Sequence, residues 1–175
     1  MITNSDVRAA AARIAGHVRS TPLIETDPGA FPPAARVWLK LEQFQHTGSF
    51  KVRGAVNRIL SAAEQGTLPA AGVVAASGGN AGLAAAYAAA RHGLPARVYV
   101  PDTAPPVKVA RLREYGAEVV QGGATYADAY EAGDKSVDLT KVMLEVQKAG
   151  LAFRAMTEVR NKLIDAYTQV MNMSV

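Results

Sequence analysis

The amino-acid composition changes near Glu131, and this change most strongly constrains how the chain can fold. All nine prolines lie at or before Pro106, whereas four of the five methionines lie after it. Up to Glu131 the basic residues are ten arginines and three lysines, and beyond it they are two arginines and four lysines. A single domain seldom changes its use of proline, of methionine and of lysine relative to arginine at one point. The sequence therefore predicts two segments, residues 1–131 and residues 132–175, whose functions are considered separately.

Composition and charge narrow the classes of function. The 175 residues are 49% hydrophobic and 19% charged, which is typical of a folded protein. The net charge of +4 comes from dispersed basic residues, so we expect no nucleic-acid partner. Cysteine is absent and the three histidines lack ligand spacing, so no metal site is predicted. No stretch approaches the roughly 20 apolar residues of a membrane span, and no secretory signal is evident, so the default expectation is a cytoplasmic protein.

The pattern of residues 1–131 is typical of an α/β fold with a parallel sheet. Short apolar runs alternate with amphipathic or alanine-rich segments, and the predicted strands are apolar on both faces, as buried parallel strands are. Ser5 or Asp6 is a candidate cap for the first helix, and Gly116 is a candidate C-cap. We expect helices over about residues 6–18, 50–63, 81–91 and 107–115, and strands over about residues 37–41, 73–76, 97–100 and 118–121.

Two loops carry residues that are suited to chemistry. The first, Thr47-Gly48-Ser49-Phe50-Lys51, ends where a predicted helix begins. Helix N-termini attract anions, and a lysine at such an end is favoured as a nucleophile. The simpler interpretation, from the residues alone, is a solvated lysine in the first helical turn.

The second loop, Ser77-Gly78-Gly79-Asn80, joins a predicted buried strand to a helix. Paired glycines allow backbone N–H groups to approach an anion, and Asn80 can cap the helix or bind a ligand oxygen. In parallel sheets, ligands bind at the carboxyl ends of the strands. The simpler interpretation is a tight strand-to-helix turn.

Taken together, the two loops resemble a known family. Residues 41–55, LEQFQHTGSFKVRGA, closely resemble the lysine motif of the pyridoxal-phosphate-dependent threonine and serine dehydratases, and Ser77–Asn80 resembles their second motif. Weaker similarities at residues 21–23, 100–101 and 115–119 extend the likeness over about residues 5–128. The resemblance implies the tryptophan-synthase-β-like fold, known as fold type II.

The resemblance also implies a role for each motif residue. Lys51 is expected to bind pyridoxal phosphate covalently and to move the Cα proton. Phe50 is expected to pack beside the cofactor ring, and Asn80 to bond the ring hydroxyl oxygen. Ser77, Gly78 and Gly79 are expected to hold the carboxylate of the amino-acid substrate. The implied reaction is β-elimination of water from threonine or serine, which gives a 2-oxo acid and ammonia.

The sequence departs from this family in two places. Ala81-Gly82-Leu83 stands where the family often has His, a small residue and Gln. Members of the family are more than twice as long, and no Gly-rich phosphate loop follows Gly123 here. Because a phosphate without its loop loses charge-assisted hydrogen bonds, we expect these 175 residues to bind the cofactor weakly and to turn over little or not at all.

Residues 132–175 have a different pattern. Apolar residues recur at steps of three and four from Leu139 to Val170, which predicts one helix of about 35 residues and roughly 52 Å with a coiled-coil-like seam. A helix of this length needs a partner to bury its seam. That partner is either the sheet of residues 1–131 or another chain, with self-association through residues 139–173 as one form.

The C-terminal segment resembles a second family. Its terminal motif, VRNKLIDAY at residues 159–167 followed by residues 170–173, is similar to the end of the flagellar hook–basal body protein that joins the MS ring to the rod. The likeness covers about residues 133–175 and implies a structural role with flagellar rod partners in the basal body. Three hypotheses follow: a pyridoxal-phosphate enzyme, a structural flagellar protein, and a fusion of the two segments with neither activity.

Overall fold

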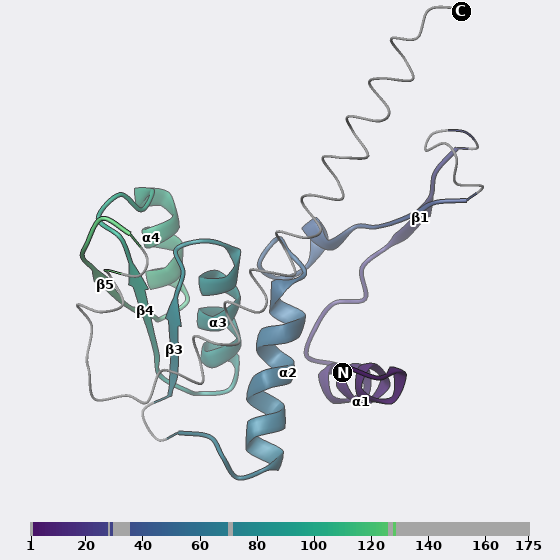
Figure 1. The fold of residues 1–175 in the computed structure, drawn as a ribbon, viewed down its shortest axis with the longest axis horizontal. Coiled ribbons are helices and arrows are strands. Elements are labelled where there is room, and N and C mark those ends of the chain that lie inside the picture. Colours follow the sequence, from purple (N-terminus) through teal and green to yellow (C-terminus); the bar gives the residue numbers. More distant parts are fainter. Residues whose placement is uncertain (1, 28, 30–35, 70–71, 126–127, 129–175) are drawn as a thin grey trace, which may run out of the picture. The chain divides into compact units, whose positions relative to one another are not determined.

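The computed structural model describes residues 2–27, 29, 36–69, 72–125 and 128 (Figure 1). The chain divides into two compact units, one of Met1–Ile24 with Leu39–Ser136 and one of Glu25–Trp38 with Val137–Val175. The elements are α1 (Asn4–Ile14), β1 (Leu23–Glu25), β2 (Trp38–Lys40), the 3-10 helix η1 (Glu42–Phe44), α2 (Lys51–Glu64), β3 (Val73–Ala76), α3 (Asn80–Arg91), β4 (Ala96–Val100), α4 (Pro106–Glu114) and β5 (Glu118–Gln121).

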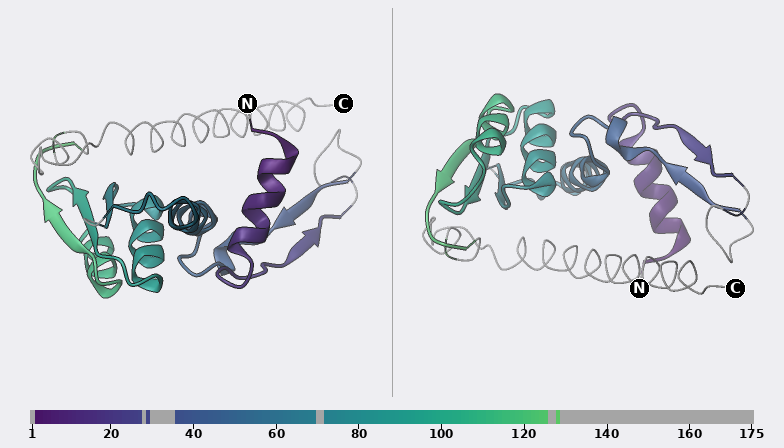
Figure 2. Two further views of the ribbon diagram at one scale, coloured as in Figure 1. Left: turned by 90° about the horizontal axis from the view of Figure 1, so that it is seen from below. Right: turned by 90° about the horizontal axis from the view of Figure 1, so that it is seen from above.

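The first unit contains a parallel three-stranded sheet in the order β3-β4-β5. Val73 pairs with Ala96, the first residue of β4, and Glu118 of β5 pairs with Arg97, the second residue of β4. Helix α3 connects β3 to β4, helix α4 connects β4 to β5, and both helices lie on the same face of the sheet (Figure 2). The predicted α/β fold with a parallel sheet and flanking helices is confirmed.

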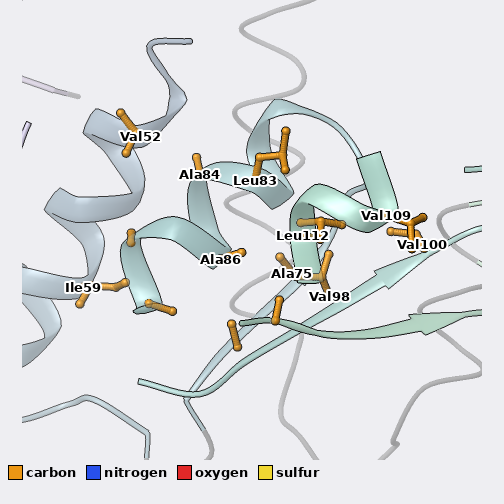
Figure 3. Close-up of a cluster of buried hydrophobic side chains, with 14 of the residues drawn as sticks. Val52, Ile59, Ala75, Leu83, Ala84, Ala86, Val98, Val100, Val109 and Leu112 are labelled. Carbon is orange, nitrogen blue, oxygen red and sulfur yellow. The ribbon is translucent and has the colours of Figure 1, made fainter. Parts of the chain in front are cut away.

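The core lies between this sheet and its helices. Val98 and Val100 of β4 and Leu112 of α4 are fully buried. Helix α3 contributes mainly alanines, which let it approach the sheet and α2 closely, and Figure 3 shows Ala84 and Ala86 within the cluster. Helix α2 adds the remaining wall through one buried stripe at helical spacing, Val52, Val56 and Ile59.

Two local predictions for the N-terminal region are wrong. Helix α1 is capped by Thr3 rather than by Ser5 or Asp6, because the Thr3 hydroxyl accepts from the Asp6 N–H at 3.3 Å and the Asp6 carboxylate accepts from the Thr3 N–H at 2.7 Å. This is a capping box. The helix ends at Ile14 and not near residue 18, since Gly16 has a positive φ of 78°.

The strand expected at residues 37–41 forms as β2, but it does not join the parallel sheet. It pairs with β1 in a separate two-stranded sheet. Both strands are exposed along their whole length, and Trp38 is 49% exposed. The Arg36 guanidinium lies 5.4 Å from the centre of the Trp38 ring and also pairs with Glu25. Alternation of apolar and polar residues predicts a strand, but it does not show whether that strand lies in the core sheet or in a small exposed sheet of two strands.

The predicted C-terminal helix, its seam from Leu139 to Val170 and the proposed segment boundary at Glu131 lie outside the described residues. Within the described ranges, no helix is long and apolar enough to cross a membrane.

Candidate active site

The lysine loop follows η1 and leads into α2. Gly48 has a positive φ of 72°, a backbone conformation that glycine adopts without strain, and its N–H donates to the Gln45 carbonyl at 2.8 Å. The turn places Thr47 and Ser49 in the interior, where they are 3% and 8% exposed. Neither hydroxyl oxygen has a hydrogen-bond partner among the described residues. Two buried hydroxyls thus stand unsatisfied within four residues of Lys51.

Lys51 is the first residue of α2, as the sequence predicts for a loop-to-helix junction. Phe50 occupies the N-cap position with helical backbone angles and makes no side-chain cap. Its ring is 41% exposed, and the Lys51 Nζ lies 5.0 Å from the ring centre. The amine and an exposed aromatic face are therefore adjacent at the start of the helix.

The second loop connects β3 to α3. Gly79 is the N-cap and Asn80 the first helical residue, so Asn80 does not cap the helix, which is one of the two roles that the sequence allows for it. The Gly79 N–H donates to the Ser77 hydroxyl oxygen at 3.3 Å, and Gly78 is buried. The Asn80 side chain is exposed at the first turn, where the helix N–H groups have no partner within the helix.

Gly82 allows this loop to lie directly on α3. A Cβ atom at residue 82 would collide with the backbone carbonyl oxygen of Ser77, and it would stand 2.9 Å from the Ser77 carbonyl carbon. The departure from the family motif at residues 81–83 therefore includes a glycine that the loop geometry requires.

The two loops lie at the same end of the first unit. Helices α2 and α3 pack against each other and begin at the same end (Figure 1), which is the end at which β3 finishes. Lys51 and Asn80 each stand in the first turn of a helix, so both positive helix ends lie there. The structure thus brings the lysine loop and the Ser77–Asn80 loop to one region, at the carboxyl end of the sheet.

An aromatic contact that the sequence does not indicate links the lysine loop to α3. The His46 ring stacks on Tyr87 of α3 with centroids 5.0 Å apart, and Tyr87 meets Tyr115 edge-on at 5.6 Å. Burial lowers the pKa of His46, and the nearby cations Arg19 and Arg91 lower it further. His46 and Tyr87 are far apart in the sequence, so no spacing rule reveals their contact.

Among the described residues, no group of three His, Cys, Asp or Glu side chains could hold a metal ion. His17 and His92 do approach each other, with ring centroids 5.2 Å apart. Two histidines without a further ligand make an incomplete metal site.

Comparison with known proteins gives a consistent picture. Residues 14–156 match the family described as pyridoxal-phosphate dependent enzyme. The chain is 38% identical over 132 residues to L-threonine ammonia-lyase of Thermotoga maritima, covering 75% of this chain and 32% of that protein. It is 42% identical over 119 residues to phenylserine dehydratase of Ralstonia pickettii, covering 67% of this chain and 36% of that protein.

Solved structures agree with the sequence relatives. The crystal structure of a pyridoxal 5'-phosphate-dependent aspartate racemase matches with a TM-score of 0.66 and 39% identity, over 75% of this chain and 41% of that one. The chain thus spans about a third of the length of the curated relatives it matches. The family match runs to residue 156 and so passes the composition change at Glu131.

Proposed function

This chain belongs to the pyridoxal-phosphate dependent enzyme family, and we propose that residues 1–131 form the lysine-bearing part of an ammonia-lyase. The proposed substrate is a small hydroxy amino acid such as threonine or serine. The reaction would eliminate water and give a 2-oxo acid and ammonia. The observation that carries this proposal is that the Lys51 loop and the Ser77–Asn80 loop lie at the same end of the first unit.

The residues at this end fit pyridoxal phosphate. Lys51 offers a primary amine beside the exposed ring of Phe50. The buried hydroxyls of Thr47 and Ser49 have no partner among the described residues, and an unsatisfied buried hydroxyl costs about 1–3 kcal/mol. The first turns of α2 and α3 present N–H groups to an anion. This cofactor needs an amine for its aldehyde, an apolar surface beside its ring, and hydrogen-bonding groups for its ring oxygen and phosphate. This end of the unit offers a group of each kind.

Each motif residue then has a proposed task. Lys51 holds the cofactor and carries the proton that leaves or returns to the substrate Cα. Phe50 would pack beside the cofactor ring, and the exposed Asn80 amide would donate to the ring hydroxyl oxygen. The Ser77 hydroxyl, which accepts from the Gly79 N–H at 3.3 Å, is available to turn towards a substrate carboxylate.

The chemistry divides between the cofactor and the chain. When bound, pyridoxal phosphate supplies an aldehyde that condenses with an amine and a ring that accepts electrons as a bond at Cα breaks. The chain supplies orientation, because Gly78 and Gly79 let the loop backbone approach the substrate carboxylate. It also supplies the base, since the Lys51 amine takes the Cα proton before water leaves.

The test is binding of the cofactor to the purified chain, followed by turnover. We expect pyridoxal phosphate to develop visible absorption with the wild-type chain, and borohydride reduction to leave the cofactor on Lys51 by peptide mass spectrometry. Lys51→Ala should abolish both signals. Lys108→Ala is the matched control, because Lys108 is an exposed lysine near the start of α4. Unchanged absorption in Lys51→Ala would refute the assignment.

The strength of binding and the product are separate measurements. Titration with pyridoxal phosphate tests the expectation that these 175 residues bind it weakly. Incubation with threonine or serine, followed by hydrazone detection of the 2-oxo acid, tests the lyase reaction. Because these 175 residues are expected to turn over little or not at all, cofactor binding without 2-oxo acid would agree with that expectation and leave the cofactor site standing. Efficient formation of 2-oxo acid would support the reaction and contradict the expected loss of turnover.

A second candidate reaction is amino-acid racemisation. Its support is the 39% identity to the aspartate racemase, a protein of the same family with a comparable match. Racemisation needs the same Cα proton removal but returns the proton instead of eliminating water. Chiral chromatography of the amino acid after incubation separates the two: a D-isomer without 2-oxo acid favours racemisation, and 2-oxo acid favours elimination.

The flagellar hypothesis for residues 133–175 remains a proposal from the sequence motif, and the comparisons lend it no support. It implies that a peptide of these residues associates with flagellar rod proteins. Sedimentation of the peptide with and without rod partners tests this, and a peptide that stays monomeric in both would remove it. The third hypothesis, a fusion of the two segments with neither activity, is tested by sequencing the source DNA across codons 125–135.

A further inference from the structure

The lysine loop is closed at its base by one ion pair. Glu42 is the first residue of η1 and Arg53 is the third residue of α2, so the two stand on either side of the loop that carries Lys51. Arg53 Nε donates to Glu42 Oε2 at 2.9 Å, and Arg53 Nη2 donates to Glu42 Oε1 at 2.7 Å. This two-bond fork fixes both distance and direction, which a single contact does not.

Further hydrogen bonds tie the pair to a third segment. The Thr21 hydroxyl donates to Glu42 Oε1, and Arg53 Nη2 also donates to the Arg19 carbonyl at 3.1 Å. The buried Gln45 side chain holds the same stretch, because its amide nitrogen donates to the Arg19 carbonyl at 2.8 Å and its oxygen accepts from the Arg19 N–H at 2.9 Å. Residues 19–21 thus brace the pair from outside the loop.

The Glu42–Arg53 ion pair is partly shielded from solvent, so its loss should perturb the local structure. The Glu42 and Arg53 side chains are 16% and 26% exposed. Hydrogen bonding from Arg53 lowers the pKa of Glu42, and the bond from Glu42 raises the pKa of Arg53. A pair of this kind is strongly perturbed when one partner is removed, because the other charge is left partly buried.

We propose that Glu42 and Arg53 are positioning residues that hold the Lys51 amine where a pyridoxal-type cofactor can reach it. The proposal rests on the proposed function of Lys51. We call the pair with its fork of two hydrogen bonds the loop clasp. Opening the loop clasp would release the loop between η1 and α2 while the sheet and its core, which the pair does not enter, stay folded.

The chain contains a matched control for the loop clasp. Arg13 Nε donates to Glu64 Oε2 at 2.7 Å and links α1 to the last residue of the same helix α2. Arg13 and Glu64 are 21% and 58% exposed. Glu64→Gln therefore removes an Arg–Glu pair from the far end of α2 without touching the lysine loop.

The experiment compares Glu42→Gln, Arg53→Lys and Glu64→Gln in the full chain with three measurements. These are the rate at which pyridoxal phosphate becomes attached to Lys51, the hydrogen exchange of amides in residues 44–51, and unfolding by urea. We expect both clasp variants to slow attachment about tenfold, which lies within the loss of up to about 100-fold that a displacement of a reacting group by about 1 Å can cause. Exchange of residues 44–51 should quicken in the clasp variants and not in Glu64→Gln.

The outcomes separate this proposal from the proposed function. The positioning proposal would be overturned if both clasp variants attached the cofactor, and exchanged the amides of residues 44–51, at the rates of the wild-type chain. It would also be overturned if Glu64→Gln slowed attachment and quickened exchange as much as the clasp variants do. If the wild-type chain attaches no cofactor at Lys51, the proposed function fails, and loop exchange alone decides on the loop clasp. Should Glu42→Gln fail to fold, Arg53→Lys decides, because it keeps the charge and removes only the fork.

Discussion

Replacing Gly82 with alanine, the smallest possible addition of a side chain, should measurably lower the stability of the fold. Replacing it with alanine adds a Cβ atom that collides with the Ser77 carbonyl oxygen, lies 2.9 Å from the Ser77 carbonyl carbon and stands 3.4 Å from Val98 Cγ1. The colliding atoms belong to the Ser77 backbone, so they cannot move away by a change of side-chain rotamer. Either the Ser77–Asn80 loop or the first turn of α3 must move.

Two opposing terms set the size of the effect. Alanine is favoured over glycine inside a helix by about 1 kcal/mol. Overpacking of a tight site costs about 1–3 kcal/mol, and a backbone obstacle places the cost at the upper end of that range. We expect Gly82→Ala to lower the free energy of unfolding by about 1–2 kcal/mol and the melting temperature by roughly 2–8 °C.

Gly54 of α2 supplies the control, because no described atom lies within 4 Å of a Cβ atom built there. Gly54→Ala should raise the free energy of unfolding by about 0.5–1 kcal/mol through helix propensity alone. Urea unfolding followed by circular dichroism measures both variants under one set of conditions. A Gly82→Ala chain as stable as Gly54→Ala would show that the loop does not rest on α3 as described.

Three further predictions concern the core and its polar groups. Leu112→Ala, at a fully buried position, should cost about 2–5 kcal/mol in urea unfolding, whereas Val107→Ala at a position 76% exposed should change stability by less than about 0.5 kcal/mol; equal effects would contradict the described core. Thr47→Val should stabilise the chain without cofactor by about 1 kcal/mol, because it removes an unpartnered buried hydroxyl and keeps the side-chain shape. The pKa values of His46 and His92 are lowered, mainly by burial, so above the ordinary value of 6.5 both histidines are neutral in the folded and unfolded chain. Below pH 6.5 the unfolded chain takes up protons first, and stability should fall as the pH approaches the folded pKa values; an Asn substitution at either histidine should flatten that dependence.

The core elements could be predicted from the sequence because their signals are local. The runs at residues 73–76 and 118–121 form β3 and β5 with the expected bounds, and α3 begins one residue before the expected start. Strand β1 has only three residues, Leu23–Glu25, and its partner lies beyond a stretch with several prolines. Such a pair depends on tertiary contacts, which periodicity does not report.

In the candidate site, too, some features could be predicted from the sequence and others depend on the placement of residues in space. The resemblance of residues 41–55 and 77–80 identifies both loops, and the structure brings them to one end of the unit. The roles assigned to Lys51 and Asn80 stay predictions until the cofactor experiment. The fork between Glu42 and Arg53 and the stacking of His46 on Tyr87 join residues by their placement in space. No pattern of residue types in one sequence distinguishes them from solvated side chains.

The exposed position of Trp38 has a practical consequence for every unfolding experiment on this chain. Trp38 is the only tryptophan, and it lies in the β1–β2 pair rather than in the buried cluster of the parallel sheet. Tryptophan emission would therefore report on that strand pair, and circular dichroism would report on the helices that cover the sheet. Two superimposable transitions would mark one cooperative unit, and two separated transitions would measure the stabilities of the two structures individually.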